Sequence, residues 1–528
     1  MSMRLSRPTT LATNGMVATP HYLASATGLR MLEAGGSAMD AVLAANAMLT
    51  VLYPDQTAIG GDCFFLVYDA QSGETVGYNG SGAAAMTASA AALRDQGYAQ
   101  MPAKGGLTVT VPGTIDAWFA GHERFGKLEM QRLLDPAIAL ARDGFPVSPR
   151  LGAVLQNDVD LITSWPGLSA LVYPQGTIPV AGERLAFPAL ATSLQRFADQ
   201  GRDAFYTGEI AEAIARSVQD AGGWLTVEDL GRHRGEWVEP VHTTYHGVDV
   251  LTTPPNSQGL TALLGLEMAS RVDLGTAWGT PAHVHPLVEA RKRAYAIRDA
   301  FLGDPRFVDI DIDIEGLLST ETIDRIWADY SPDYATTGPY ALPGDTVYLC
   351  AIDRDGNAVS LIQSLFGAFG SCVVAGNTGI ILQNRGFSFS LVEGSPNELM
   401  GGKRTLHTLM PNMLLRDGRL LGPIGTQGGD AQAQINMQLL TNVIDFGMEP
   451  QEAIEAPRWL SGAGLTLLLE NGFPESTPAL LAARGHEITL IGPWNPDAGH
   501  AQMILVDEER GVLRGGADPR ADGTADGY

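Results

Sequence analysis

The sequence predicts a mixed α/β (α+β) protein built as a four-layer αββα sandwich, with two β-sheets stacked between two layers of helices. Three observations support this prediction. The strand expected at residues 346–352 is apolar on both alternating faces, as in a sheet that is covered on both sides. Short turns join this strand and others into hairpins, and long helical patterns come before and after the strands.

The first 300 residues are dominated by helical patterns. Gly35-Gly36 provides a left-handed stop between the first two helices. Gly60-Gly61 then turns the chain into an apolar run at 63–68, which we expect to be a buried strand. The clearest helices are expected at residues 22–33, 38–52, 133–141, 211–219, 259–269 and 284–301.

The composition and the hydrophobic pattern of the chain change at residue 346. Residues 330–345 are rich in Pro, Gly and Thr without apolar periodicity, which predicts an exposed, mobile tail. Strand 346–352 then pairs with strand 358–364 across a turn in which Gly356 supplies the positive φ angle. The other elements expected in this half are a hairpin of residues 412–415 and 420–424 and a helix at 431–445.

Composition restricts the partners of the protein. Lys and Arg total 34 against 59 Asp and Glu, so the net charge of −25 disfavours binding to nucleic acid or to an anionic membrane. The N-terminus lacks an apolar stretch typical of a secretory signal, and segment 41–52 is too short to span a bilayer. Cys63, Cys350 and Cys372 lack metal-ligand spacing, so we expect buried, reduced thiols in a cytoplasmic protein without a metal or cofactor.

Thr346 lies at an unusual junction, where a flexible Gly-Asp segment enters a buried strand. A threonine hydroxyl is a weak nucleophile unless a base lies beside it. If the peptide bond before Thr346 is broken, its own α-amino group becomes that base, with an unperturbed pKa of about 7.7–8.0. A threonine that begins a strand is structural in most proteins, so this signal needs a second one.

The second signal is Gly428-Gly429, which lies between a strand and the start of helix 431–445. Free N–H groups and the helix dipole favour negative charge there, so the pair could stabilise a tetrahedral oxyanion. A tight turn that requires two glycines is the alternative interpretation.

Several motifs occur in a fixed order along nearly the whole chain. The first half contains IGGDCFFLVYD, VTVPGTIDAW and LVEARKRAYAIRDAFLGDP, among others. The second half contains TVYLCAIDRDGNAVSLIQSLFGAFGS, GKRTLHTLMP, GTQGGD and GADPRADGTADGY. From about Gly15 to Tyr528 the chain therefore resembles the γ-glutamyltransferase family of N-terminal nucleophile (Ntn) hydrolases.

This resemblance implies a proenzyme that cuts itself between Asp345 and Thr346. The products would be a large subunit of residues 1–345 and a small subunit of residues 346–528, which together form one Ntn-hydrolase domain. Members occur as single pairs of subunits and as larger assemblies, so a homo-oligomer stays open.

The resemblance also assigns roles within the site. Thr346 matches the nucleophile, Gly428 and Gly429 match the oxyanion pair, and Ser364 matches a hydroxyl that supports the nucleophile. Thr408 matches a pocket hydroxyl. His407 takes the neighbouring position, where a structural histidine is as good an interpretation as a substrate contact.

The departures from the family pattern concern the substrate. Ser388 stands where γ-glutamyl enzymes carry an acidic residue for the substrate amino group, and the early stretch 82–89 lacks their arginine. Phe366 replaces a pocket asparagine. A buried zwitterion without charged partners is strongly disfavoured, so glutathione is a poor candidate.

These features favour hydrolysis of the amide of a small acidic substrate. The pattern is most similar to the branch that contains oxamate amidohydrolase, which acts in purine catabolism. A γ-glutamyltransferase or glutathione hydrolase, a cephalosporin or glutaryl acylase, and an unprocessed binding protein are the alternatives. The substrate carboxylate needs a cation, and the candidates are Arg385, Lys403 and Arg404.

Overall fold

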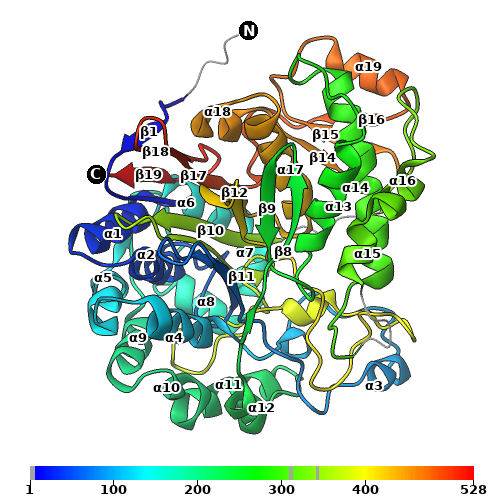
Figure 1. The fold of residues 1–528 in the computed structure, drawn as a ribbon. Coiled ribbons are helices and arrows are strands. Elements are labelled where there is room, and N and C mark those ends of the chain that lie inside the picture. Colours follow the sequence, from blue (N-terminus) through cyan, green and yellow to red (C-terminus); the bar gives the residue numbers. More distant parts are fainter. Residues whose placement is uncertain (1–5, 308–312, 340–343) are drawn as a thin grey trace.

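Two antiparallel sheets of seven strands each form the centre of the protein (Figure 1). A computed structural model describes residues 6–307, 313–339 and 344–528. The first sheet has the order β1 (Thr10–Ala12), β18 (Val512–Ala517), β17 (Ala501–Asp507), β13 (Arg419–Thr426), β12 (Asn412–Arg416), β9 (Val248–Thr252) and β8 (Val241–Tyr245). The second has the order β19 (Thr524–Gly527), β2 (Met16–Thr19), β10 (Asp345–Ile352), β11 (Ala358–Phe366), β3 (Asp62–Tyr68), β4 (Thr75–Asn79) and β7 (Glu236–Val238).

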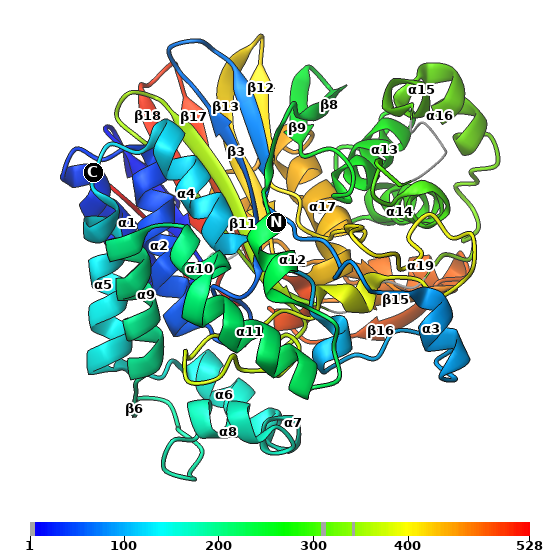
Figure 2. The ribbon, with the colours of Figure 1, turned by 90° about the horizontal axis from the view of Figure 1, so that it is seen from below.

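Helices cover the outer face of each sheet, as Figure 2 shows from below. The second sheet is covered by α1 (Tyr22–Glu33), α2 (Ala38–Leu52) and α4 (Thr114–Phe125), and α5 (Met130–Asp143) packs on the outside of α2. The first sheet is covered by α13 (Gly259–Ala269), α17 (Gln432–Ile444) and α18 (Pro450–Glu455), and α14 (Pro281–Phe301) packs on α13 and α17. The predicted four-layer αββα sandwich is therefore confirmed.

Further elements surround these four layers. Outer helices are α3 (Ala90–Asp95), α6 (Pro149–Asn157), α7 (Val159–Thr163), α8 (Pro166–Val172), α9 (Pro188–Gln200), α10 (Asp203–Tyr206), α11 (Gly208–Asp220), α12 (Val227–Arg232), α15 (Ile314–Leu318), α16 (Thr320–Trp327) and α19 (Thr477–Ala483). A small sheet contains β14 (Trp459–Ser461), β15 (Thr466–Leu469) and β16 (Glu487–Leu490). The pair β5 (Phe145–Pro146) and β6 (Arg184–Leu185) stands apart.

Alternating side chains of β10 connect two of the three largest hydrophobic cores. Val347, Leu349 and Ala351 pack into the core beneath α2, α4 and α5. Tyr348, Cys350 and Ile352 instead pack between the two sheets. The third core lies between the first sheet and α13, α14 and α17. Because successive side chains of a strand point to opposite faces, an uninterrupted apolar run is what a strand buried on both sides requires.

Most predicted elements agree with the structure to within a few residues. The helices expected at 22–33, 38–52 and 259–269 have those bounds, and Gly35 has the expected positive φ of 88°. The helix expected from residue 431 begins at Gln432, because a short 3-10 turn at Gly429–Ala431 precedes it. Cys63, Cys350 and Cys372 are buried and free, as predicted. None of the helices in the described ranges is long and apolar enough to cross a membrane.

The segment before the strand of Thr346, predicted to be an exposed and mobile tail, has hydrogen bonds to the later half of the chain. The Ala335 N–H donates to the Arg484 carbonyl at 2.6 Å, and Gly338 exchanges two backbone hydrogen bonds with Gly464 at 3.0 and 2.8 Å. The segment therefore lies along the surface of the later half of the chain as far as residue 339, and its mobility stays a prediction. Residues 340–343 of the predicted tail lie outside the described residues.

Candidate active site

Thr346 lies at the start of β10 and is buried, with 1% of its surface exposed. The strand pairs with β11 through a register shift between Asp345 and Val347. This irregularity places Thr346 beside Ser364 of β11, and the Thr346 hydroxyl donates to the Ser364 Oγ at 3.1 Å. A bulge of this kind commonly re-aims a side chain next to a site.

The Ser364 hydroxyl connects Thr346 to the peptide bond that precedes it. Its O–H donates to the Asp345 carbonyl oxygen at 2.6 Å. Its oxygen accepts the Phe366 N–H at 2.7 Å in addition to the Thr346 hydroxyl. One donor and two acceptor sites are all that a hydroxyl has, so the hydrogen-bond direction is fixed. The Asp345 carbonyl is therefore polarised next to the Thr346 oxygen.

Two glutamines hold Thr346 from the other side, and sequence reasoning missed both. The Thr346 N–H donates to Gln427 Oε1 at 3.3 Å, and Gln432 Nε2 donates to Thr346 Oγ1 at 3.4 Å. Both flank the Gly428-Gly429 pair in the sequence. Their position next to Gly428-Gly429 could have predicted this contact, because residues that stabilise an oxyanion must lie close to the nucleophile.

Gly428 and Gly429 lie beside the same peptide bond. Their φ angles of 137° and 55° fall in a region that glycine adopts without strain. A Cβ added to Gly429 would lie 2.6 Å from the Gly344 nitrogen. A Cβ added to Gly344 would lie 3.0 Å from the Gly429 Cα and 3.3 Å from the Phe366 ring. The structure therefore brings Phe366 and both glycines together with Thr346, and Gly344 fills the space between them.

A cleft of about 840 Å³ opens at this junction, lined by Asp345, Gln427, Gly428, Arg150 and His500 among others. Burial and the nearby Asp55 carboxylate raise the pKa of Asp345 to about 7, while Arg150 opposes the shift. Arg150 itself is bound to Asp55 at 2.7 Å.

His407 belongs to a second buried group that reaches the same region. Its Nδ1 accepts the Leu409 N–H at 3.3 Å, so the ring hydrogen is on Nε2, which lies 3.0 Å from Asp62 Oδ2. Burial lowers the pKa of His407 well below its usual value, and the nearby Arg385 lowers it further. His407 is therefore a neutral side chain with protein partners on both nitrogens, and it contacts no atom of Thr346.

Thr408 links this group to the glycine pair. Its hydroxyl accepts from Arg385 Nη1 at 2.9 Å, and its carbonyl accepts from Gln258 Nε2 at 3.0 Å. The same Gln258 amide donates to the Gly429 carbonyl at 3.2 Å. Asp62, Gln258, Arg385, His407 and Thr408 thus form one connected group, which we call the wall. Asp62 and Gln258 were not predicted from the sequence, whereas Arg385 was a candidate.

The remaining candidates lie around this wall. Ser388 ends a 3-10 turn that begins at Arg385, and its buried Oγ has no hydrogen-bond partner among the described residues. Lys403 Nζ donates to the Pro396 carbonyl at 2.7 Å. Arg404 lies 2.9 Å from the Glu236 carboxylate. The latter two cations are thus already bound to other groups.

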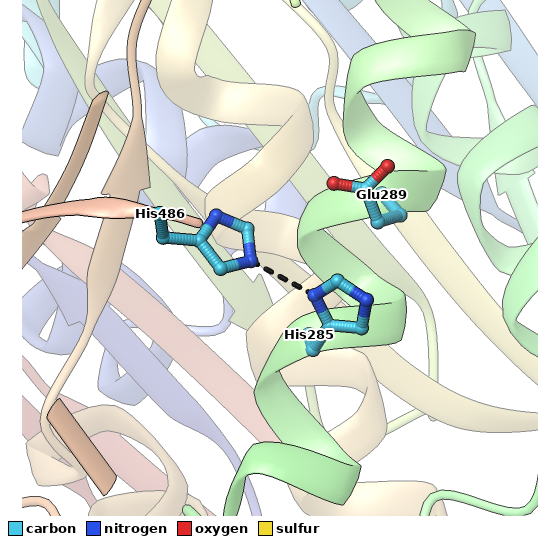
Figure 3. Close-up of side chains that lie close together, drawn as sticks. All are labelled: His285, Glu289 and His486. Atoms are coloured by element: carbon cyan, nitrogen blue, oxygen red, sulfur yellow. Dashed lines mark hydrogen bonds between the residues drawn. The ribbon is translucent and has the colours of Figure 1, made fainter. Parts of the chain in front are cut away.

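One buried cluster elsewhere has the residue types of a metal site, namely His285, Glu289 and His486 (Figure 3). His285 Nε2 lies 2.9 Å from the Ser331 carbonyl, which directs the other nitrogen, Nδ1, to accept from His486 Nε2 at 2.8 Å. The Glu289 carboxylate binds the Lys292 ammonium at 2.9 Å. Protein partners thus bind His285 and Glu289, while His486 Nδ1 has no hydrogen-bond partner among the described residues. Through Ser331 and Thr336 the cluster contacts the segment before the strand of Thr346.

The αββα fold, with a threonine at the start of a central strand, defines the protein as an N-terminal nucleophile hydrolase by class. The family model described as Gamma-glutamyltranspeptidase matches residues 24–528. The "Glutathione hydrolase-like YwrD proenzyme" of Bacillus subtilis (strain 168) is 41% identical, over 98% of this chain and 99% of the relative.

Two further proteins are similar over nearly their whole length. The "Oxamate amidohydrolase proenzyme" of Klebsiella pneumoniae is 37% identical, over 98% of this chain and 99% of the relative. The crystal structure of cephalosporin acylase from Bacillus halodurans aligns with a TM-score of 0.94 and 38% identity, covering 100% of this chain and 98% of that chain. The chain therefore belongs to the gamma-glutamyltranspeptidase family, as the sequence motifs predicted.

Proposed function

We propose that the chain cuts itself between Asp345 and Thr346 and then hydrolyses amides with Thr346 as the nucleophile. The observation that carries this proposal is the Ser364 hydroxyl, which contacts both the Thr346 oxygen and the Asp345 carbonyl. The nucleophile, the carbonyl and a donor to that carbonyl are thus adjacent before any cut.

In the cut, the Thr346 oxygen bonds to the Asp345 carbonyl carbon and the hydroxyl proton is passed on to the nitrogen. The C–N bond breaks, which leaves an ester between Asp345 and the Thr346 side chain. Water hydrolyses this ester to a carboxylate at Asp345 and a free amine and hydroxyl at Thr346. The products are a large subunit of residues 1–345 and a small subunit of residues 346–528.

In turnover, the free Thr346 amine takes the hydroxyl proton as the oxygen attacks the substrate amide. The backbone N–H groups of Gly428 and Gly429 stabilise the oxyanion, which typically contributes 10²–10³-fold per donor. The amine proton passes to the leaving nitrogen, and water hydrolyses the acyl ester. Gln427, which accepts the Thr346 N–H in the uncut chain, keeps the new amine beside the hydroxyl.

The proposed substrate is the amide of a small acid, oxamate first, which gives oxalate and ammonia. The ester formed in the cut is itself an acyl-enzyme, so the surroundings of Gly344 and Asp345 describe the acyl pocket. Gly344 has no room for a Cβ between Gly429 and Phe366. Ser388 and the arginine-free stretch 82–89 supply no charged partner for a glutamyl zwitterion.

A second candidate is an acylase with a larger leaving amine. The cleft of about 840 Å³ supports this candidate, because drug-sized ligands typically occupy pockets of about 300–1,000 Å³. In either case the acyl part is small and the chemistry at Thr346 is the same.

Two measurements test the proposal. A denaturing gel of the purified protein should show two chains, and sequencing of the smaller should begin Thr-Val-Tyr-Leu. A panel of oxamate, a γ-glutamyl anilide and a glutaryl amide should then give the highest kcat/KM for oxamate. A fully active single chain contradicts the cut, and an equal or higher value for the γ-glutamyl substrate contradicts the choice of acyl group.

A further inference from the structure

Arg385 is a fully buried cation with half of its guanidinium unused. None of its surface is exposed, and Nη1 donates to Thr408 at 2.9 Å. Within the described part of the chain, Nε and Nη2 have no hydrogen-bond partner. Burial lowers the pKa of Arg385 to about 10, so the group keeps its charge at neutral pH.

The two unused nitrogens form one edge of the guanidinium. Nε–H and Nη2–H point in nearly the same direction, and this edge matches the two oxygens of a carboxylate in a bidentate pair. A buried charge without such a partner is strongly disfavoured. The edge therefore has the chemistry of a site that awaits an anion with two parallel acceptors.

The acidic groups nearest to Arg385 do not neutralise it. Asp62 and Asp430 act on it electrostatically, yet no carboxylate within the described ranges lies within the 4.0 Å of an ion pair with it. Asp62 accepts from His407, and Asp430 lies 3.4 Å from Arg298. Both acids are thus bound by other groups.

Arg385 borders the acyl pocket through Phe366. Its guanidinium carbon lies 4.3 Å from the centre of the Phe366 ring, and the edge of the same ring limits the space that Gly344 fills. On the other side, Thr408 and Gln258 connect Arg385 to the Gly429 carbonyl through three hydrogen bonds. Arg385 therefore lies against Phe366 and is linked to Gly429, next to the place proposed for the acyl group.

Three other cations that border the cleft or were candidates from the sequence are engaged. Arg150 donates to both oxygens of Asp55 at 3.3 and 2.7 Å, and Asp345 adds negative charge beside it. Lys403 and Arg404 are bound to the Pro396 carbonyl and to Glu236. Of these four cations, Arg385 is the one with a free bidentate edge.

We propose that Arg385 binds the carboxylate of the acyl group and selects amides in which that carboxylate adjoins the scissile carbonyl. This inference rests on the proposed function of Thr346 and names the substrate class of that site. Arg385 is linked to Gly429 by three hydrogen bonds, so a two-carbon acyl group, whose carboxylate adjoins the reacting carbonyl, suits it better than a glutaryl group does.

The test compares oxamate with oxamide, a neutral amide of nearly the same shape. The selectivity is the ratio of the kcat/KM for oxamate to that for oxamide. In Arg385→Gln this ratio should fall about a hundredfold or more, since breaking a buried charge pair costs at least two tenfold steps. Arg385→Lys keeps the charge without the bidentate edge and should lose part of the ratio. Lys403→Gln removes a cation that is already bound, and should leave the ratio unchanged.

Self-cleavage into chains of 345 and 183 residues checks that each variant folds, because the cut does not involve Arg385. A variant that is cut normally yet keeps the wild-type ratio overturns the inference. If the wild-type enzyme releases no ammonia from oxamate, the proposed substrate fails, and calorimetry with oxalate still tests Arg385. Weaker oxalate binding in Arg385→Gln than in the wild type supports the inference, and equal affinity overturns it.

Discussion

The Ser364 hydroxyl lies 2.6 Å from the Asp345 carbonyl oxygen and donates a hydrogen bond to it. The Ser364 Oγ in turn accepts the Thr346 hydroxyl at 3.1 Å. Ser364 therefore aligns the attacking oxygen and polarises the attacked carbonyl at once. Because this contact exists in the uncut chain, the contributions of Thr346 and Ser364 to the cut can be tested by substitution.

Replacing the nucleophile should separate folding from processing. Thr346→Ala has no hydroxyl to attack the Asp345 carbonyl, so the chain should stay intact and inactive while its circular dichroism is unchanged. Thr346→Ser should be cut more slowly, because serine lacks the β-methyl that restricts χ1. Gel electrophoresis over time measures both rates. A Thr346→Ala chain that still matures would mean that another group or a protease makes the cut.

Removing the Ser364 hydroxyl should slow the cut. Ser364→Ala deletes one donor to the developing oxyanion, which typically lowers such a rate by about 10²–10³-fold. The matched control is Ser360→Ala on the same strand, which removes a buried hydroxyl bound to Tyr348 at 2.9 Å. Half-times of cleavage after expression give the comparison, and equal half-times for both variants would exclude this role for Ser364.

Gln427 should affect turnover through the orientation of the new amine. In Gln427→Met the acceptor of the Thr346 N–H is lost while side-chain length is kept, so we expect kcat to fall by about tenfold or more at nearly constant KM. Gln438→Met, on the same helix as Gln432 but bound to Trp459, is the control. A change in KM alone would place Gln427 in substrate binding instead.

The KM for oxamate should depend on the ionisation of Asp62. Burial raises the pKa of Asp62 to about 7, with Arg385 opposing the shift. Below pH 7 the side chain is protonated, and above pH 7 its negative charge partly cancels that of Arg385. The KM for oxamate should therefore rise as the pH increases through 7, whereas that for oxamide should not.

In Asp62→Asn the ratio of the KM for oxamate to the KM for oxamide should no longer change with pH. The pH dependence of kcat should still show the titration of the Thr346 amine. Kinetics with both substrates at each pH cancel effects common to the two. A KM ratio that is flat across pH 6–8 in the wild type would show that Asp62 does not sense the substrate charge.

The sequence predicts the layers of the fold well because each layer is a local pattern. The unbroken apolar run of β10 requires two covered faces. The turns at Gly35 and Gly356 mark where the first helix and β10 end. The placement of Thr346 at the start of that strand is likewise a local property. The Gly428-Gly429 pair before a helix is a second local signal, and the resemblance of the chain to a known family then adds Ser364.

Contacts between distant segments could not be predicted in this way. Gln427 and Gln432 reach Thr346 only because β13 and α17 meet β10 in space. The Nε–Nη2 edge of Arg385 is free because no acceptor from another segment of the described ranges lies within hydrogen-bond distance of it. Residues 331–339 have no periodicity of their own, and the partners that fix them, such as Gly464, come more than a hundred residues later.

Strand β10 has a consequence for what happens after the bond before Thr346 is broken. The strand lies between β2 and β11, so its neighbours come from both sides of the cut. The residues of β10 that pair with β2 and β11 all lie after the bond, except Asp345, which pairs with Phe366. If the bond opens as proposed, the pairing from Val347 onward therefore does not depend on it. An unfolded pair of fragments, however, must find each other by diffusion before this sheet can form. If the proposed cut occurs, the mature enzyme keeps a shape that only the intact precursor folds readily, and maturation is a one-way step.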